Sequence, residues 1–521
     1  MRLRLHLPLG PPRLLLALVL LALLGSSVQA VAPLRFQITL PQTLTHGEAS
    51  GRLFVLMART KPPDGILRVG FVPGETWLAA AEVRHLAPGR TISFDPDALA
   101  YPKPFSQAGP GTWYCMALLD QDHNYADHDQ DADDVYGPLV TLTDAARTRP
   151  IALTLDRQGK PDALADTPSI KRMEFQSPLL SAFWGRPIVM RAAVVLPPNY
   201  DKDPKRLFPN VYHVEGYGGD YTSAWQAGPH LLAQMTSGEK ASFIHVFLDA
   251  SFPTGHTVFA DSVNNGPWGR ALTQDLVPAL EAKYRLAPDP ALRFLTGHSS
   301  GGWSTLWLQT SYPDFFGGTW STSPDPVDLR SFTGVNATPG STDNFYVKAD
   351  GTPRNLVRMG GHDLASMEQF AHQEQVQGEY GGQFASFEWV WSPRGQDGRP
   401  LPLFDRETGR LDPAVLQAWQ SYDIRRNLET NWPTLGPKLR GKLHVFVGSA
   451  DTFHLEEGVA YLQDFFKRVG SNAVCEVIPG ADHFDLYNPR KAYPDGLSVR
   501  IDQEMAAAAR AHEPMTPHRV Q

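Results

Sequence analysis

The chain has 521 residues, which exceeds one ordinary domain and leads us to expect two. Its 42% hydrophobic and 20% charged residues exclude a disordered or fibrous protein. The net charge of −8 is spread along the chain, which argues against nucleic acid or an anionic membrane as the partner.

The first thirty residues have the pattern of a secretory signal peptide. Arginines precede an almost unbroken apolar run over residues 14–24, and Val28-Gln29-Ala30 places small residues where a signal peptidase reads. The run is shorter than the roughly 20 residues that a membrane span needs. We therefore expect residues 1–30 to be removed and the protein to be exported, periplasmic or secreted, with no stable membrane span. The alternative is a single membrane anchor.

Residues 31–155 are typical of a small β-sandwich-like domain. Short runs of β-forming residues are separated by Pro and Gly, as sandwich strands are. The expected strands are residues 34–40, 52–57, 66–71, 113–119 and 139–142.

An acidic stretch, residues 120–134, interrupts this domain with seven aspartates. So many carboxylates in one loop could coordinate calcium, but the stretch lacks the glycine and the closing glutamate of an EF-hand loop. The sequence therefore favours a solvated acidic loop, and we expect no metal site. Cys115 and Cys475 are expected in different domains, so two buried free thiols are favoured over a disulfide.

From residue 165 to 521 apolar strands alternate with amphipathic helices. This pattern predicts a mostly parallel sheet with helices on both faces. The expected strands are residues 188–196, 210–214, 243–249, 292–296, 317–321, 443–447 and 473–478, with helices at 270–285, 303–311 and 458–469. Residues 323–439 break the rhythm and are interpreted as a cap-like insertion, with helical pieces at 364–372 and 413–427.

The sequence Gly297-His298-Ser299-Ser300-Gly301-Gly302 joins an expected strand to an expected helix. Gly-x-Ser-x-Gly in that setting is the nucleophile elbow of the α/β-hydrolase fold, in which a sharp turn holds the serine exposed and the glycines avoid clashes. We therefore predict that Ser299 is the nucleophile.

A serine hydroxyl needs a base to accept its proton and an acid to orient that base. In this fold the order along the chain is serine, acid, histidine. Asp451 follows the strand at 443–447, and His483 follows the last strand, so we predict these two as acid and base. Glu456 and Glu457 are competing acids expected to face water, and His454 is a competing base.

A tetrahedral intermediate also needs backbone N–H donors. We expect them from Ser300, which follows the nucleophile, and from Tyr217 in the glycine-rich turn after the strand at 210–214. Asn264, Asn265 and Trp268 lie on the carboxyl side of another strand, where ligands bind such sheets, and are candidate substrate-binding residues. Packing is an equally good interpretation of Trp268.

The chain resembles the putative esterase family, which includes esterase D, the enterochelin esterases, feruloyl esterases and the mycolyltransferases. The matching pieces are the motif at 297–302, Ser177–Ser181, Val194–Tyr200, Gly216–Gly219 and Pro479–His483. The chain is similar to an exported bacterial subgroup with a β-rich N-terminal domain. It departs from the family in two ways. Glu215 stands where a histidine usually precedes the oxyanion turn, and compact members of the family lack the insertion at 323–439.

The resemblance implies a serine carboxylic-ester hydrolase that acts through an acyl-enzyme on a small-molecule or glycan-linked ester, without a cofactor. Three alternatives remain at this point: a peptidase of the prolyl-oligopeptidase type, an acyltransferase, and a non-enzymatic surface binding module. The acyl group, the alcohol and the oligomeric state do not follow from the sequence.

Overall fold

The structure is a computed structural model that describes residues 34–43, 47–128, 130–160, 164–378 and 380–512. The expected signal peptide lies outside these residues, so export stays a prediction. In the described ranges, no helix combines the length and apolarity that crossing a bilayer requires.

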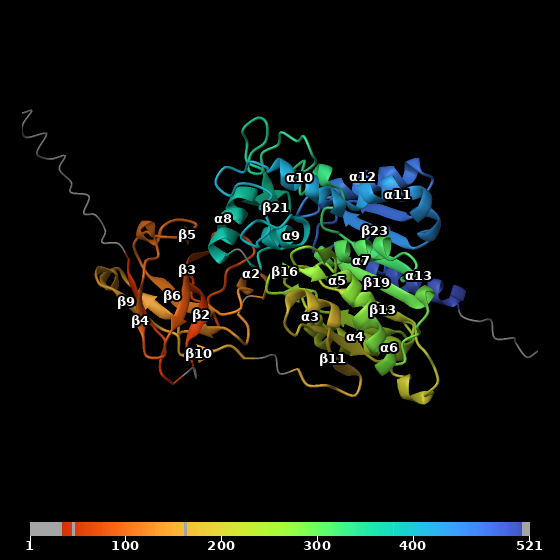
Figure 1. The fold of residues 1–521 in the computed structure, drawn as a ribbon, viewed down its shortest axis with the longest axis horizontal. Coiled ribbons are helices and arrows are strands. Elements are labelled where there is room, and N and C mark those ends of the chain that lie inside the picture. Colours follow the sequence, from red (N-terminus) through yellow and green to blue (C-terminus); the bar gives the residue numbers. More distant parts are fainter. Residues whose placement is uncertain (1–33, 44–46, 129, 161–163, 379, 513–521) are drawn as a thin grey trace, which may run out of the picture.

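The N-terminal region, residues 34–160, contains two sheets (Figure 1, left). One apolar cluster holds residues of both sheets, including Phe36 of β1 and Val55 of β2. The alternate residues of β2, such as Phe54, belong to a second cluster that includes Val376 of the insertion. The three-stranded sheet is β4-β1-β9: Thr91–Phe94, Phe36–Thr39 and Ile151–Thr154. The larger sheet is β10-β7-β6-β2-β3-β5, with β8 paired to β6: Arg157–Gln158, Val135–Tyr136, Trp113–Asp120, Ala49–Ala58, Thr76–Leu86, Ala100–Tyr101 and, for β8, Val140–Leu142.

One strand expected in this region is wrong. Residues 66–71 form a loop, and the long strand β3 follows it instead. The free thiols are as expected: Cys115 lies in β6 and Cys475 in a distant strand, and both are buried and unpaired. Burial raises the pKa of each thiol to about 12.

The rest of the chain is built on an eight-stranded sheet (Figure 1, right). Strands β14, β13, β19, β20, β23 and β24 run parallel to one another, whereas β12 is antiparallel to both of its neighbours, β11 and β14. This is the arrangement of an α/β-hydrolase, as the sequence predicts. In sheet order the strands are β11 Ile170–Gln176, β12 Val189–Val195, β14 Ile244–Leu248, β13 Asn210–Val214, β19 Arg293–His298, β20 Gly318–Thr322, β23 Leu443–Gly448 and β24 Val474–Ile478.

Helices cover both faces because alternate side chains of each strand point to opposite sides. In β13, Val211 joins a cluster with helix α13, whereas Tyr212 and Val214 join a cluster on the other face. The helix expected at 270–285 is divided into three consecutive pieces. These are α5 (Trp268–Ala271), a π-helical turn (Leu272–Leu276) and α6 (Val277–Lys283). The helices are α3 Pro178–Trp184, α4 Ala224–Ser237, α5 Trp268–Ala271, α6 Val277–Lys283, α7 Ser300–Ser311, α12 Leu455–Arg468 and α13 Leu497–His512.

The insertion shares its core with the sheet domain. Trp391 and Trp419 of the insertion lie in one apolar cluster with Trp303 of α7 and Val459 of α12. Figure 1 shows its helices beside the N-terminal region as well. Its elements are β21 Asn355–Met359, β22 His362–Ser366, α8 Met367–Gln377, α9 Gln383–Trp391, α10 Pro413–Trp419 and α11 Ile424–Lys438. The helix expected at 364–372 therefore begins later, after a short strand.

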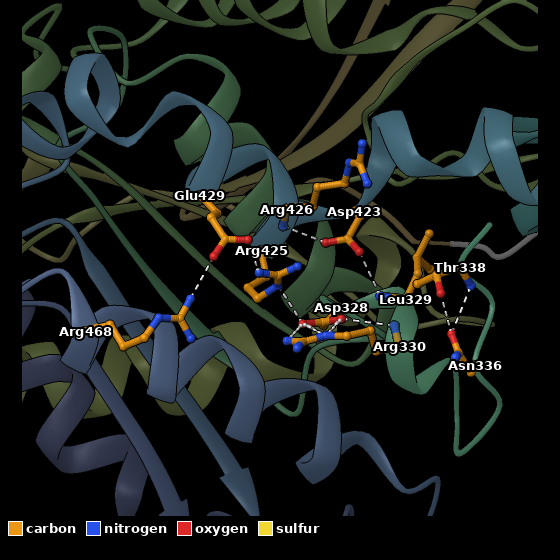
Figure 2. Close-up of polar contacts among 10 residues, drawn as sticks. All are labelled: Asp328, Leu329, Arg330, Asn336, Thr338, Asp423, Arg425, Arg426, Glu429 and Arg468. Carbon is orange, nitrogen blue, oxygen red and sulfur yellow. Dashed lines mark hydrogen bonds and ion pairs between the residues drawn. The ribbon is translucent and has the colours of Figure 1, made fainter. Parts of the chain in front are cut away.

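A charged network ties the two ends of the insertion together (Figure 2). Asp328, fully buried just after β20, forms an ion pair with Arg425 at 2.6 Å and accepts a hydrogen bond from Arg330 at 2.6 Å. Asp423, at the start of α11, accepts from the Leu329 N–H at 3.0 Å. The segment that leaves β20 is thereby held against the segment that re-enters the sheet.

Candidate active site

Ser299 sits at the sharp turn between β19 and α7. Its backbone has φ 58° and ψ −124°, a conformation that a non-glycine residue rarely adopts. A Cβ on Gly301 would lie 1.9 Å from the Val214 carbonyl oxygen, so only glycine fits there. The strained turn and its glycine are what the Gly-x-Ser-x-Gly pattern predicts, and the serine remains partly exposed.

The structure brings Asp451 and His483 together although they are 32 residues apart. Asp451 follows β23, His483 follows β24, and their Oδ2 and Nδ1 atoms are 2.9 Å apart. Both are buried, at 0% and 3% exposure. Burial acts to raise the pKa of Asp451, but the hydrogen bond from His483, its charge and the Phe453 N–H hold that pKa below its usual value. The lowered pKa keeps the Asp451 carboxylate ionised where it contacts the imidazole of His483.

His298, next to the serine in sequence, is a residue that the sequence did not single out. Its ring centroid lies 4.4 Å from that of His483, and its Nδ1 is 3.1 Å from Thr322 Oγ1. Burial, with the neighbouring His483 charge, lowers the pKa of His298 to about 3. It is thus neutral at ordinary pH and packs against the candidate base without competing for its proton.

Asp325 is a second buried carboxylate that sequence reasoning missed. Its Oδ2 accepts from the Ser300 hydroxyl at 2.5 Å, and its N–H donates to the Ser299 carbonyl at 3.2 Å. Burial raises its pKa to about 6, whereas the Ser300 hydroxyl and the His483 charge act to lower it. Asp325 belongs to no recognisable motif. Its position three residues after β20, at the carboxyl end of a parallel strand, is the one feature of the sequence that could have marked it as a candidate site residue.

The candidate oxyanion turn lies against the nucleophile. A Cβ on Gly216 would be 3.2 Å from Ser299 Cβ and 3.9 Å from its Oγ, so the turn approaches the serine as closely as glycine allows. Ser300, the other candidate donor, begins α7 and is buried. Glu215 accepts from Ser223 Oγ at 2.7 Å, and burial raises its pKa.

The three candidate substrate-binding residues are buried, and their side-chain polar atoms have partners in the described part of the chain except for Asn265 Nδ2. Asn264 Nδ2 donates to the Ser392 carbonyl at 2.8 Å. Asn265 Oδ1 accepts from Thr254 Oγ1 at 2.9 Å. Trp268 belongs to an apolar core cluster. The Asn264 bond connects this loop to the insertion, whereas the side-chain bonds of Asn265 and Trp268 lie within the loop itself.

The competing acids are used elsewhere. Glu456 pairs with Arg358 of the insertion at 2.5 Å, so the expectation that it faces water is wrong. Glu457 is exposed, and it accepts from Ser331 Oγ at 2.7 Å.

The acidic stretch is less solvated than the sequence suggests. Asp120 and Asp134 are 1% and 0% exposed, because they accept N–H bonds from the loop's own backbone. Burial, reinforced by neighbouring carboxylates, raises the pKa of Asp122 to about 7 and of Asp134 to about 9. Across the described ranges, no three His, Cys, Asp or Glu side chains form a group suited to a metal ion.

Residues 187–423 match the profile of a family described as "Putative esterase". No curated protein sequence matches the chain. The solved structures that match the chain include a ferulic acid esterase, with 14% identity, a TM-score of 0.39, and coverage of 66% of this chain and 97% of that one. A fluorophosphonate-binding serine hydrolase of Staphylococcus aureus has 14% identity, a TM-score of 0.38 and coverage of 65% and 98%. An S-formylglutathione hydrolase of Agrobacterium tumefaciens has 14% identity, a TM-score of 0.37 and coverage of 67% and 98%.

Proposed function

We propose that the chain, whose residues 187–423 match the putative esterase family, hydrolyses carboxylic esters through Ser299, His483 and Asp451. Ser299 is the nucleophile, His483 the general base and acid, and Asp451 the residue that orients His483. The backbone N–H groups of Tyr217 and Ser300 form the oxyanion hole.

In the first step the Ser299 hydroxyl attacks the acyl carbon while His483 takes its proton. The tetrahedral intermediate collapses to an acyl-enzyme as His483 gives that proton to the leaving alcohol. Water then attacks the acyl-enzyme by the same route in reverse, which releases the acid and restores the serine. The ionised Asp451 stabilises the imidazolium in both steps.

The observation that carries this proposal is the 2.9 Å contact between the buried His483 and Asp451. The two residues come from neighbouring parallel strands that end beside the Ser299 turn. A buried carboxylate in contact with an imidazole, beside a strained serine, is costly for the fold and is the arrangement that nucleophilic catalysis needs.

We further propose that residues 31–155 and 165–521 act as two domains and that the insertion at 323–439 is a cap that shapes the pocket. The ester is a small molecule or is attached to a glycan. Export through removal of residues 1–30 is part of the same proposal.

Steady-state hydrolysis of short-chain aryl esters tests the reaction. We expect the purified protein to turn these esters over, and Ser299→Ala or His483→Ala to lose activity by about 10⁴-fold or more. Matched anilides and added alcohol acceptors separate peptidase and acyltransferase activity. Anilide cleavage faster than ester cleavage would overturn the assignment, as would no turnover in a broad ester panel.

A further inference from the structure

We propose that Asp127, from the N-terminal region, and the Tyr217 side chain are positioning residues that fix the oxyanion turn, Gly216–Asp220. The N-terminal region is then a working part of the active site, although it supplies no catalytic group. This inference rests on the proposed function, in which the Tyr217 N–H is an oxyanion donor.

Two hydrogen bonds join the acidic stretch to the turn. Asp127 Oδ1 accepts from the Gly218 N–H at 2.9 Å, and the Tyr217 hydroxyl contacts the Ala126 carbonyl oxygen at 2.6 Å. The same hydroxyl contacts the carbonyl oxygen of Gly381 in the insertion. Asp127 is 7% exposed, so its bond to the turn is shielded from water. Three distant parts of the chain therefore meet at one tyrosine.

These contacts constrain the donor from both sides. The Tyr217 side chain is tied to Ala126 and Gly381, and the next amide is tied to Asp127, so the residue that carries the donor cannot rotate independently. Gly218 has φ 80°, which gives the chain a tight turn at that point. An oxyanion donor stabilises the transition state most when it is already oriented and needs no reorganisation.

The segment that carries Asp127 is itself firmly held. It is the short helix α2, Tyr125–His128, whose first residue is 1% exposed and packs its ring 5.0 Å from that of Phe54 in β2. The Tyr125 N–H also donates to Asp120 Oδ2 at 3.1 Å. The position of Asp127 is thus set by the N-terminal sheet, which makes it a rigid brace for the turn.

Kinetics of Asp127→Ala, Asp127→Asn and Tyr217→Phe on an aryl ester test the proposal, with inhibition by phenylboronic acid measured in parallel. The boronate binds serine as a tetrahedral adduct and so reports the oxyanion hole. We expect Asp127→Ala and Tyr217→Phe to lower kcat about 10- to 100-fold with KM nearly unchanged, and to weaken boronate inhibition by a similar factor. Asn keeps a side-chain oxygen that can accept from Gly218, so Asp127→Asn should retain most activity.

Asp133→Asn is the matched control, because Asp133 lies exposed on the same stretch and contacts no part of the turn among the described residues. A kcat of Asp127→Ala and Tyr217→Phe within twofold of wild type would overturn the inference. So would a loss of kcat without weaker boronate inhibition. If Asp127→Ala does not fold, the kinetics of Tyr217→Phe test the inference by themselves, because that substitution removes only one oxygen atom. Failure of the proposed function looks different, because the wild-type protein would then hydrolyse no ester.

Discussion

Two buried carboxylates, Asp451 and Asp325, contact residues of the candidate catalytic site. Asp451 contacts His483 directly, whereas Asp325 contacts Ser300 and the backbone of Ser299. The electrostatic influence of each carboxylate reaches His483. A negative charge near an imidazole favours its protonated form, which is the form that appears in the transition state.

Replacing Asp325 by Asn should change the pH dependence of the reaction. Above about pH 6 the Asp325 carboxyl is ionised, and its negative charge stabilises the positive charge that forms on the imidazole in the transition state. Without that carboxyl, kcat at neutral pH should fall about tenfold, and the part of the acid limb of the kcat/KM profile that comes from Asp325 ionisation near pH 6 should disappear. The measurement is a pH–rate profile of both proteins between pH 4.5 and 9. An unchanged acid limb would show that Asp325 has only a packing role.

Some residues of the candidate site can be predicted from the sequence and others cannot, because a local pattern marks the first group and long-range packing places the second. The positions of Ser299, Asp451 and His483 follow from local pattern, since each comes directly after an apolar strand and carboxyl ends of parallel strands meet. Asp127 is 91 residues from the Gly218 amide from which it accepts, and it belongs to the N-terminal region. Such a contact depends on how two packed regions meet, which hydrophobic periodicity does not encode.

At the scale of elements, the apolar strands of the parallel sheet were predictable because burial on both faces gives them continuous apolar runs. Strand β3 was missed because Ala79 to Glu82 has weak β propensity, and its place comes from pairing with β2 and β5. The insertion is visible in the sequence because it interrupts the alternation of strands and helices. How it packs against the rest of the chain cannot be predicted from that pattern. That packing depends on side chains such as Asp328 and Arg425, which meet across about a hundred residues (Figure 2).

The Figure 2 network allows a paired test of stability. The Arg425 side chain is 10% exposed and bonds to the fully buried Asp328, so Arg425→Met leaves a buried carboxylate with one arginine fewer. We expect a loss of about 2 kcal/mol in the free energy of unfolding, measured by urea denaturation. Arg468→Met is the control, because Arg468 meets Glu429 at an exposed position and should cost less than about 1 kcal/mol. Equal losses would contradict this account of the network.

At the scale of the whole molecule, the N-terminal region reaches the site at a second point. Phe71, 41% exposed, lies 5.4 Å from the ring of Phe453, which lies 4.7 Å from His483. Phe484 is 63% exposed and lies 5.3 Å from the same imidazole. Exposed rings from separate parts of the chain thus lie beside His483, the proposed base, and we expect the apolar part of an ester to pack against them.

Phe71→Ala should therefore alter selectivity. We expect kcat/KM for esters with a bulky apolar acyl group to fall about fivefold relative to acetyl esters, because a lost aromatic contact is worth about 1 kcal/mol. The measurement is the ratio of kcat/KM values for a matched pair of aryl esters. Leu207→Ala, an exposed apolar residue in the loop before β13, should leave the ratio unchanged. An unaltered ratio in Phe71→Ala would remove the N-terminal region from the pocket.

The central claim is that Ser299 is an activated nucleophile. Treatment of the folded protein with a fluorophosphonate, followed by mass spectrometry of the intact chain and of its peptides, tests this most directly. We expect one adduct per chain, located on Ser299, absent from Ser299→Ala and formed much more slowly in His483→Ala. An adduct on another residue, or labelling of Ser299→Ala at the wild-type rate, would contradict it.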